Sequence, residues 1–373
     1  MKKKIFKSLK RTFLIISALL ALFIIAVAIF VNTQPQMGKK PHGQDLERIS
    51  KSPNYGDQEF INLIETKMGS FGEMIATMPD FLFGEGGTPD EPLPVKFGEN
   101  ATPAIDSLCF VTWYGHSAFL IEIEGKRILI DPMLGEHSSP VSFATPRFPY
   151  QKPIPIEELT DIDAIILSHD HYDHLDYATI IKLKEETAHF FTALGVGSHL
   201  KHWGVDESQI TELDWWQTTT LGEIEIIACP ARHFSGRAFT DRNATQWASW
   251  VIKGKYQNLY FSGDGGYGPH FKEIGEKYGP FDLAMLECGQ YNQAWAAIHM
   301  MPEQSVQAGF DVKARTIMPI HWGAFELSVH TWTDPIIRFK AESERLNANM
   351  IHPFIGERFN LGVDMPQTEW WNL

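Results

Sequence analysis

The hydrophobic positions of this chain form one long unbroken run near the N-terminus and many short runs from about residue 107 onward. The long run, Phe13 to Val31, contains 19 residues and no charge. As a helix it would be about 29 Å long, which is enough to cross the hydrocarbon core of a bilayer. The pattern therefore predicts a transmembrane anchor over residues 13–31.

Six basic residues and no acidic ones precede this run, within residues 1–12: Lys2, Lys3, Lys4, Lys7, Lys10 and Arg11. Positive charge stays on the cytoplasmic side of a membrane span. We therefore expect a cytoplasmic N-terminus and a body across the membrane, in the periplasm if the cell is Gram-negative. A cleaved signal peptide is the alternative, because Ala26-Val27-Ala28 fits a small-x-small cleavage site. The apolar run continues past that site, which favours the retained single-pass anchor.

Residues 32–106 form a connector that is rich in proline, glycine and charge. Two apolar patches interrupt it, at Phe60–Ile64 and at Met74–Phe83. Proline and glycine mark turns and loops, so we expect only part of the connector to be ordered. It is either a tether or a segment that packs over the body or touches lipid, and the sequence leaves both interpretations open.

Short apolar runs and helical patterns alternate over residues 107–360, and residues 361–373 follow as a C-terminal tail. Strands are predicted at 109–113, 118–123, 127–132, 162–168, 221–228, 245–252, 259–262, 283–287 and 316–319. Helices are predicted after the fourth of these strands, to about residue 186, and at 268–278, 302–311 and 334–346. Hairpins first, then alternating strands and helices, predict sheets covered by helices: an α/β sandwich that forms one catalytic domain.

The charge of the chain argues against one class of partner. Of 32 basic side chains, six lie in the first eleven residues, which leaves 26 against 46 acidic ones, or −20, for the rest. A body this acidic repels phosphate backbones, so we do not expect nucleic acid as a partner. Cys109, Cys229 and Cys288 are odd in number and far apart, which fits neither a disulfide framework nor a C-x-x-C metal site.

Candidate metal ligands cluster in Ser168–Asp176, directly after the fourth predicted strand. His169 and His171 are two residues apart, so in extended backbone both imidazoles point the same way and can reach one metal ion. Asp173 and His174 follow where a helical pattern starts, which aims them at a second point nearby. A polar surface turn is the alternative. Three histidines and an aspartate at H-x-H-x-D-H spacing favour a metal site with nitrogen and oxygen ligands that suit zinc.

Three more candidate ligands follow later apolar strands: His233, Asp264 and His321. Side chains at strand ends lie in loops, where chemistry is usually carried. Asp264 also lies in Gly263–Gly268, which matches the G-x-G-x-x-G dinucleotide fingerprint, and Glu287 ends the next strand about 20 residues on. We favour the metal site, because Asp264 would place a carboxylate beside a pyrophosphate and a dinucleotide would leave the histidines unexplained.

These motifs resemble the metallo-β-lactamase superfamily and, within it, the N-acylphosphatidylethanolamine phospholipase D group. The resemblance spans about residues 107–356. It rests on these stretches: Trp113–Ala118, Ile130–Pro132, Leu167–Tyr177, Ser262–Asp264, His299–Glu303 and Ile320–Phe325. It implies an αββα sandwich, the metallo-β-lactamase fold, with two zinc ions between the sheets, although Mn²⁺ and Fe²⁺ tolerate the same ligand types.

Carried over position by position, the resemblance divides the metal ligands into two sets. The first zinc would take His169, His171 and His233. The second would take Asp173, His174 and His321. Asp264 would bridge the two ions, His299 would touch the substrate, and His116 and Asp131 would support the site from behind. For the last two residues, plain turn structure is the alternative.

The resemblance also implies a zinc-dependent hydrolase that cleaves a phosphodiester in a membrane lipid, as a phospholipase D does, on N-acylphosphatidylethanolamine-like substrates. The two ions would activate water for attack on phosphorus, with His299 as the proton donor or orienter for the leaving alkoxide. Apolar residues close in sequence to these ligands are candidates for an entrance for acyl chains, and packing in the core is the commoner alternative: Trp295, Met300, Met301, Phe325, Leu327 and Trp332. The alternatives are a metal-dependent lactonase or esterase for a small soluble substrate, and a membrane-tethered binding protein without turnover.

Overall fold

The computed structural model describes residues 2–67, 72, 76–79, 87–98, 107–238 and 240–372. The apolar patch expected at 74–83 falls mostly outside these residues, and so does the end of the connector at 99–106. The described helices are α1 (Lys2–Thr33), α2 (Gln44–Ile49), α4 (Tyr177–Leu183), α5 (Gly197–His202), α6 (His270–Lys277), α7 (Pro302–Asp311) and α8 (Asp334–Leu346). Short 3-10 turns are η1 (Pro35–Met37), η2 (Ile156–Glu158), η3 (Glu207–Gln209) and η4 (Gln293–Trp295).

The first sheet has seven strands and changes from antiparallel to parallel pairing across its width. In spatial order its strands are β15 (Arg358–Asn360), β3 (Cys109–Trp113), β4 (Phe119–Ile123), β5 (Lys126–Ile130), β6 (Ala164–Leu167), β7 (Phe190–Ala193) and β8 (Ile210–Leu213). Pairing is antiparallel from β15 to β5 and parallel from β5 to β8. Every residue of β6 is buried, as expected for a parallel strand covered on both faces.

The second sheet has six strands and repeats this change of pairing. Its order is β14 (Ile317–Ile320), β13 (Leu283–Glu287), β12 (Asn258–Phe261), β11 (Ser249–Lys253), β10 (Ile224–Cys229) and β9 (Thr218–Leu221). Strands β9 to β12 pair antiparallel, and β12 to β14 pair parallel. A separate ribbon joins β1 (Tyr55–Gly56) and β2 (Glu59–Phe60).

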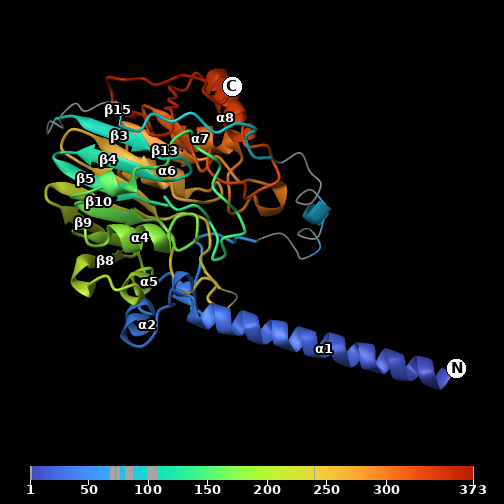
Figure 1. The fold of residues 1–373 in the computed structure, drawn as a ribbon. Helices are drawn as coiled ribbons and strands as arrows, with labels where there is room; N and C mark the ends of the chain where they lie inside the picture. The colour runs from blue at the N-terminus through green and yellow to red at the C-terminus, as the bar shows by residue number, and fades with distance from the viewer. Residues whose placement is uncertain are drawn as a thin grey trace.

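The two sheets pack against each other and helices cover the outside, so the expected αββα sandwich is confirmed (Figure 1). Phe119 of the first sheet meets Phe261 of the second with ring centroids 6.3 Å apart. Helices α6, α7 and α8 lie together beside β13, and α4 and α5 lie at the other end of the body (Figure 1). The core between the sheets is one continuous cluster of buried apolar side chains.

Two predicted strands differ from the structure in informative ways. The predicted strand at 221–228 is β10 from Ile224 onward, but Leu221 belongs to β9, which turns into β10 at Gly222 with φ +63°. The run at 245–252 becomes a strand only at Ser249, since the backbone N–H groups of Gln246 and Ala248 bond the carbonyls of Leu194 and Ser168 instead of a neighbouring strand. Strands β7, β8 and β15 and helix α5 are not predicted from the sequence.

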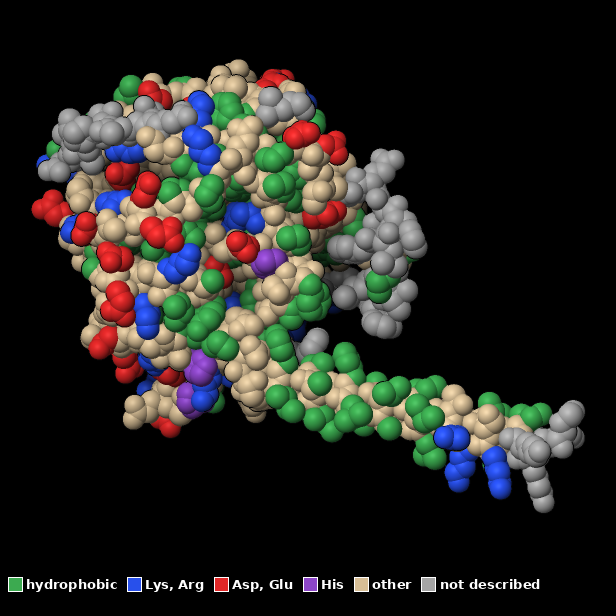
Figure 2. Space-filling view, viewed as in Figure 1, with side chains coloured by type: hydrophobic (Ala, Val, Ile, Leu, Met, Phe, Trp, Pro, Cys, Tyr) green, Lys and Arg blue, Asp and Glu red, His purple; other side chains and the backbone are tan. Residues whose placement is uncertain are grey.

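Helix α1 projects from the body and exposes apolar side chains along its length, with basic side chains near its N-terminal end (Figure 2). Its stretch Ile5–Thr33 is long and apolar enough for a membrane span or a signal sequence. Beyond α1, the described part of the connector packs on the body. Met37, Ile49 and Phe60 are all buried there.

Candidate metal centre

The candidate ligands come from both sheets and meet at the carboxyl ends of their strands. His169 begins the loop that follows β6, and Asp264 and His321 follow β12 and β14. His233 lies beyond the end of β10. Since parallel strands end at the same edge of a sheet, this topology gathers residues far apart in the sequence. His169, His174, His233, Asp264 and His321 are all at most 3% exposed.

Three imidazoles form the first group of ligands. The Nε2 atom of His169 lies 2.9 Å from Nδ1 of His171, and Nε2 of His233 lies 3.2 Å from the same atom. His233 donates its Nδ1 hydrogen to the carbonyl of Ile298 at 2.9 Å, and His169 Nδ1 contacts Ser168 Oγ at 2.8 Å. Their Nε2 atoms therefore carry lone pairs that converge on one point. Two nitrogens bound to one zinc at ~2.1 Å would lie about 3.4 Å apart, close to what is seen.

A second group gathers around two carboxylates. Nε2 of His174 lies 3.0 Å from Asp264 Oδ2 and 3.5 Å from Asp173 Oδ2. His321 lies within 3.9 Å of Asp173 and 3.2 Å of Asp264. Asp264 Oδ2 is also 4.0 Å from Nε2 of both His169 and His233. Asp264 thus stands between the two groups, where a bridging ligand would be.

The residues expected behind the site do contact the ligands. Asp131 accepts a hydrogen bond from His174 Nδ1 at 2.7 Å and another from the Ser168 N–H at 2.7 Å. His116 Nε2 contacts Asp173 Oδ2 at 2.8 Å. His116 also belongs, with Asp173, His174 and His321, to a set whose donor atoms lie within 4.8 Å of one another. His116 and Asp131 have positive φ, +54° and +39°, so each shapes a turn in addition to contacting a ligand.

Glu287 is a site residue that the sequence did not reveal as one. It ends β13, is fully buried, and bonds His299 Nδ1 with one oxygen and the Gly265 N–H with the other at 2.7 Å. The His299 ring centroid lies 5.1 Å from that of His233 and 5.4 Å from that of His321. An acid at the end of an otherwise apolar, buried strand was the signal available for Glu287.

Burial and nearby charges set the protonation of these side chains. Burial holds the pKa values of His169, His233 and His321 well below the ordinary imidazole range. At His174 burial acts the same way, but Asp264, Asp173 and Asp131 together outweigh it and raise the pKa. Burial raises the pKa of Asp264 to about 7. The neutral imidazoles of His169, His233 and His321 lie near acidic oxygens and are suited to binding a cation.

One buried atom reinforces the fit to metal ions. Asp264 Oδ1 has no hydrogen-bond partner among the described residues, although His321 Nδ1 is 3.2 Å away. A buried carboxylate oxygen without a donor is costly unless a cation neutralises it. The residues present therefore fit divalent metal ions, and the nitrogen and oxygen donors suit zinc, iron or manganese.

A cavity of about 420 Å³ opens over these donors. Its apolar wall includes Phe234, Ile298 and two residues expected at the entrance, Trp295 and Leu327. Met300, Phe325 and Trp332 follow the alternative and pack into the protein: Met300 and Phe325 are at most 1% exposed, and Trp332 packs on Phe148 and Trp370. Met301 does not line the cavity either, and its N–H bonds Gln304 at the start of α7.

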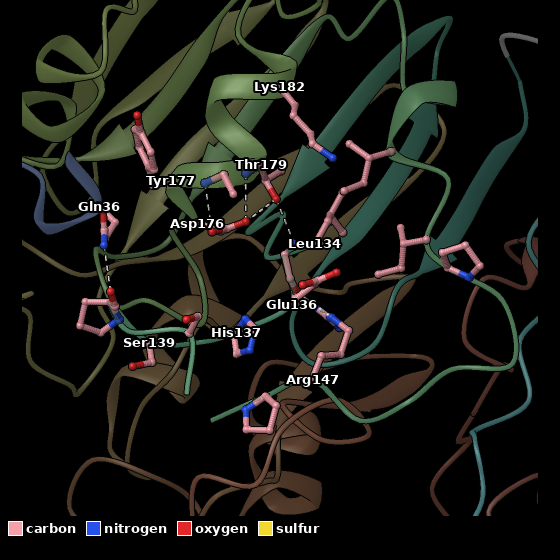
Figure 3. A pocket seen from close by; sticks show the side chains of 18 of the residues that line it. Gln36, Leu134, Glu136, His137, Ser139, Arg147, Asp176, Tyr177, Thr179 and Lys182 are labelled. Atoms are coloured by element: carbon pink, nitrogen blue, oxygen red, sulfur yellow. Dashed lines mark hydrogen bonds between the residues drawn. The ribbon is translucent and has the colours of Figure 1, made fainter. Parts of the chain in front are cut away.

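A second and larger cavity, about 1250 Å³, shares no lining residue with the first (Figure 3). Its walls come from the loop between β5 and β6, the start of α4, and Phe30 of α1. Asp176, at its edge, caps α4 by accepting from the N–H groups of Ala178 and Thr179 (Figure 3). Asp176 thus fixes one end of the loop Ser168–Asp176, which carries four of the candidate ligands and which we call the metal-binding loop.

Comparisons with known proteins cover the part of the chain that holds these residues. Residues 126–322 match the Beta-lactamase superfamily domain, a segment that runs through all seven candidate ligands. An uncharacterized protein of Mycobacterium tuberculosis is 39% identical over 330 residues, which are 87% of this chain and 88% of that protein. The N-acyl-phosphatidylethanolamine-hydrolyzing phospholipase D 1 of Caenorhabditis elegans is 35% identical over 234 residues, 60% of this chain and 66% of that protein. Among solved structures, the metallo hydrolase Igni18 of Ignicoccus hospitalis has the same fold, with a TM-score of 0.53 at 21% identity over 69% of this chain and 100% of that one.

Proposed function

Because this chain belongs to the β-lactamase superfamily and is a metallo-hydrolase, we propose that it cleaves a phosphodiester of a membrane lipid at a dinuclear metal centre. The reaction is of the phospholipase D type, on N-acylphosphatidylethanolamine-like lipids, which the similarity to the Caenorhabditis elegans enzyme supports. The observation that carries the proposal is the pair of ligand groups that share Asp264 beneath an apolar cavity.

The ligands divide into the two groups described above. His169, His171 and His233 would hold one metal ion, and Asp173, His174 and His321 would hold the other. Asp264, whose Oδ2 lies within 4.0 Å of His169, His174 and His233, would serve both. Two divalent ions in such a site supply a nucleophilic water at neutral pH and offset the charge of phosphoryl oxygens.

The chain's own contribution to proton transfer lies with His299 and Glu287. Burial raises the pKa of Glu287 well above its usual range and lowers that of His299. A protonated Glu287 donates to His299 Nδ1, which leaves the ring hydrogen on Nε2. His299 lines the cavity. We propose that the Nε2 hydrogen passes to the leaving alkoxide as the Glu287 proton passes to Nδ1, so that His299 stays neutral and Glu287 becomes a carboxylate.

The lipid substrate is supported by the cavity wall and by α1. Trp295, Ile298 and Leu327 give the cavity over the metal ligands an apolar side that suits an acyl chain. We propose that α1 is a single-pass anchor with a cytoplasmic N-terminus, which keeps the catalytic unit, residues 107–360, next to the bilayer from which it draws substrate. A span of this length and a basic N-terminal flank support that topology.

The test is hydrolysis by the full chain of N-acylphosphatidylethanolamine in mixed micelles, in water enriched in ¹⁸O. Attack at phosphorus predicts one ¹⁸O atom in the phosphatidate product and none in the N-acylethanolamine. His169→Ala should abolish the reaction, whereas His202→Ala, an exposed histidine at the end of α5, should not change it. Intact lipid alongside rapid, chelator-sensitive hydrolysis of a soluble ester or lactone would refute the lipid assignment and favour the small-substrate alternative.

A further inference from the structure

The structure assigns the segment Gln34–Pro41, which we call the helix-base segment, a part in holding the metal-binding loop. This segment directly follows α1, whose last residue is Thr33. It reaches the loop through two buried side chains, Arg237 and His199. The inference rests on the metal site of the proposed function, but not on its substrate.

Arg237 joins the helix-base segment to both ends of the loop. Its side chain is buried, and one terminal nitrogen donates to the carbonyls of Asp170 at 2.6 Å and Leu175 at 2.8 Å. The other terminal nitrogen and Nε donate to the carbonyl of Gln36 at 2.7 Å and 3.1 Å. The Tyr172 ring covers the guanidinium at 4.0 Å. A planar guanidinium with five N–H donors is suited to fixing several carbonyls at once.

His199 makes the second connection. The carboxylate of Asp170, which stands between His169 and His171, accepts from His199 Nε2 at 3.2 Å and from Thr245 Oγ1 at 2.8 Å. His199 Nδ1 accepts the backbone N–H of Lys39 at 3.0 Å. Because Nδ1 is an acceptor, the ring hydrogen must be on Nε2, which lets His199 donate to Asp170. The helix-base segment therefore sets the tautomer that supports the loop.

The segment is seated closely enough for this role. Gly38 has φ +66°, and a Cβ there would lie 2.1 Å from His199 Nδ1. Trp203 Nε1 donates to the carbonyl of Pro35 at 2.6 Å, and Gln36 Nε2 donates to the carbonyl of Pro140 at 2.9 Å, at the edge of the larger cavity (Figure 3). The segment fits against His199 only because residue 38 has no side chain.

The consequence concerns metal affinity. Four ligands, His169, His171, Asp173 and His174, lie in a loop whose backbone is fixed at residues 170 and 175 by Arg237. Losing contacts that orient ligands typically lowers metal affinity 10–100-fold. Cleavage after Ala28 would leave the helix-base segment on the body, so this support serves the anchored and the processed chain alike.

The experiment compares two glycine substitutions in the full chain. Gly38→Ala forces a Cβ into His199, whereas Gly43→Ala is a matched control: its φ is also positive, +55°, but a Cβ there meets nothing within 4 Å. Zinc affinity of the metal-stripped proteins is measured by competition with a fluorescent chelator, and ligand geometry by the visible spectrum of the Co²⁺-loaded proteins. We expect Gly38→Ala to bind zinc at least tenfold more weakly with an altered cobalt spectrum, and Gly43→Ala to stay within twofold of wild type.

A second variant keeps the test decisive if Gly38→Ala does not fold. Arg237→Lys retains the positive charge but cannot bond the carbonyls of residues 36, 170 and 175 together, so it should also weaken zinc binding and alter the cobalt spectrum. Wild-type affinity and spectrum in the folded variants would overturn the inference, and so would a wild-type chain that binds no metal. Wild-type metal binding without lipid cleavage would refute only the proposed substrate.

Discussion

Replacing Asp131 with asparagine should weaken metal binding 10–100-fold, although Asp131 is not itself one of the proposed ligands. Its carboxylate accepts hydrogen bonds from the Ser168 N–H at 2.7 Å, from Ser168 Oγ, and from His174 Nδ1 at 2.7 Å. Asparagine keeps the shape of the side chain and tolerates the φ of +39°. It replaces one oxygen with an NH₂ group, however, which cannot accept.

Each orientation of the amide at residue 131 has a cost. If NH₂ faces the Ser168 N–H, a buried donor loses its acceptor at about 1–3 kcal/mol. If NH₂ faces His174, Nδ1 becomes the acceptor, the ring hydrogen moves to Nε2, and His174 loses the lone pair it offers to a metal. A tenfold change in affinity is ~1.4 kcal/mol, so these costs match the 10–100-fold loss usual for supporting residues.

The assay for Asp131→Asn is a competition titration of metal-stripped full chain with zinc and a chelator of known affinity. Asp206→Asn is the matched control, since Asp206 caps η3 on the surface by accepting from Ser208, and asparagine caps about as well as aspartate. The control should bind zinc as wild type does. Equal zinc affinity in Asp131→Asn and Asp206→Asn would refute the argument that Asp131 sets the tautomer of His174.

Three further predictions address the ligands, the metal and the pH dependence of folding. His169→Ala should lose bound metal and activity together in metal analysis and lipid assay, and activity with full metal content would contradict the ligand assignment. Removing metal with a chelator should lower the thermal midpoint, because a cation that binds only the folded chain stabilises it; an unchanged midpoint would argue against a metal site. Burial lowers the pKa of His270 to about 3, so below about pH 6.5 the unfolded chain takes up a proton that the folded chain does not, and stability falls with pH. Between pH 6 and 4, the free energy of urea unfolding should fall with decreasing pH less steeply in His270→Gln than in wild type, by ~1.4 kcal/mol per pH unit. Parallel plots of unfolding free energy against pH for the two proteins would contradict this.

The parts of the site that depend on local pattern were predictable from the sequence. An apolar strand followed by H-x-H-x-D-H places four donors within six residues, and Asp264 and His321 also follow apolar strands directly. The structure brings all of these side chains together, because the strands end at one edge of the sandwich. The αββα arrangement followed from the resemblance, whereas β9 was not predicted because its residues before Leu221, Thr218 to Thr220, form no apolar run.

The support around the ligands depends on contacts between distant residues, which no local pattern reveals. Arg237 bonds Gln36, 201 positions away, and His199 bonds Lys39, 160 positions away. Glu287 was noticed only as the end of a dinucleotide fingerprint, whereas in the structure it holds His299. The supporting role of such residues is recognised only from their tertiary contacts. Their spacing and flanking sequence are the same as those of ordinary buried polar residues.

The central claim is that seven side chains hold two metal ions, and anomalous X-ray diffraction from crystals of the full chain, at the absorption edge of the bound metal, tests it most directly. The account predicts two anomalous peaks, one about 2.1 Å from nitrogens of His169, His171 and His233. The other should lie beside Asp173, His174 and His321, with Asp264 between the two. Peaks away from these residues, or none in metal-loaded crystals, would contradict it.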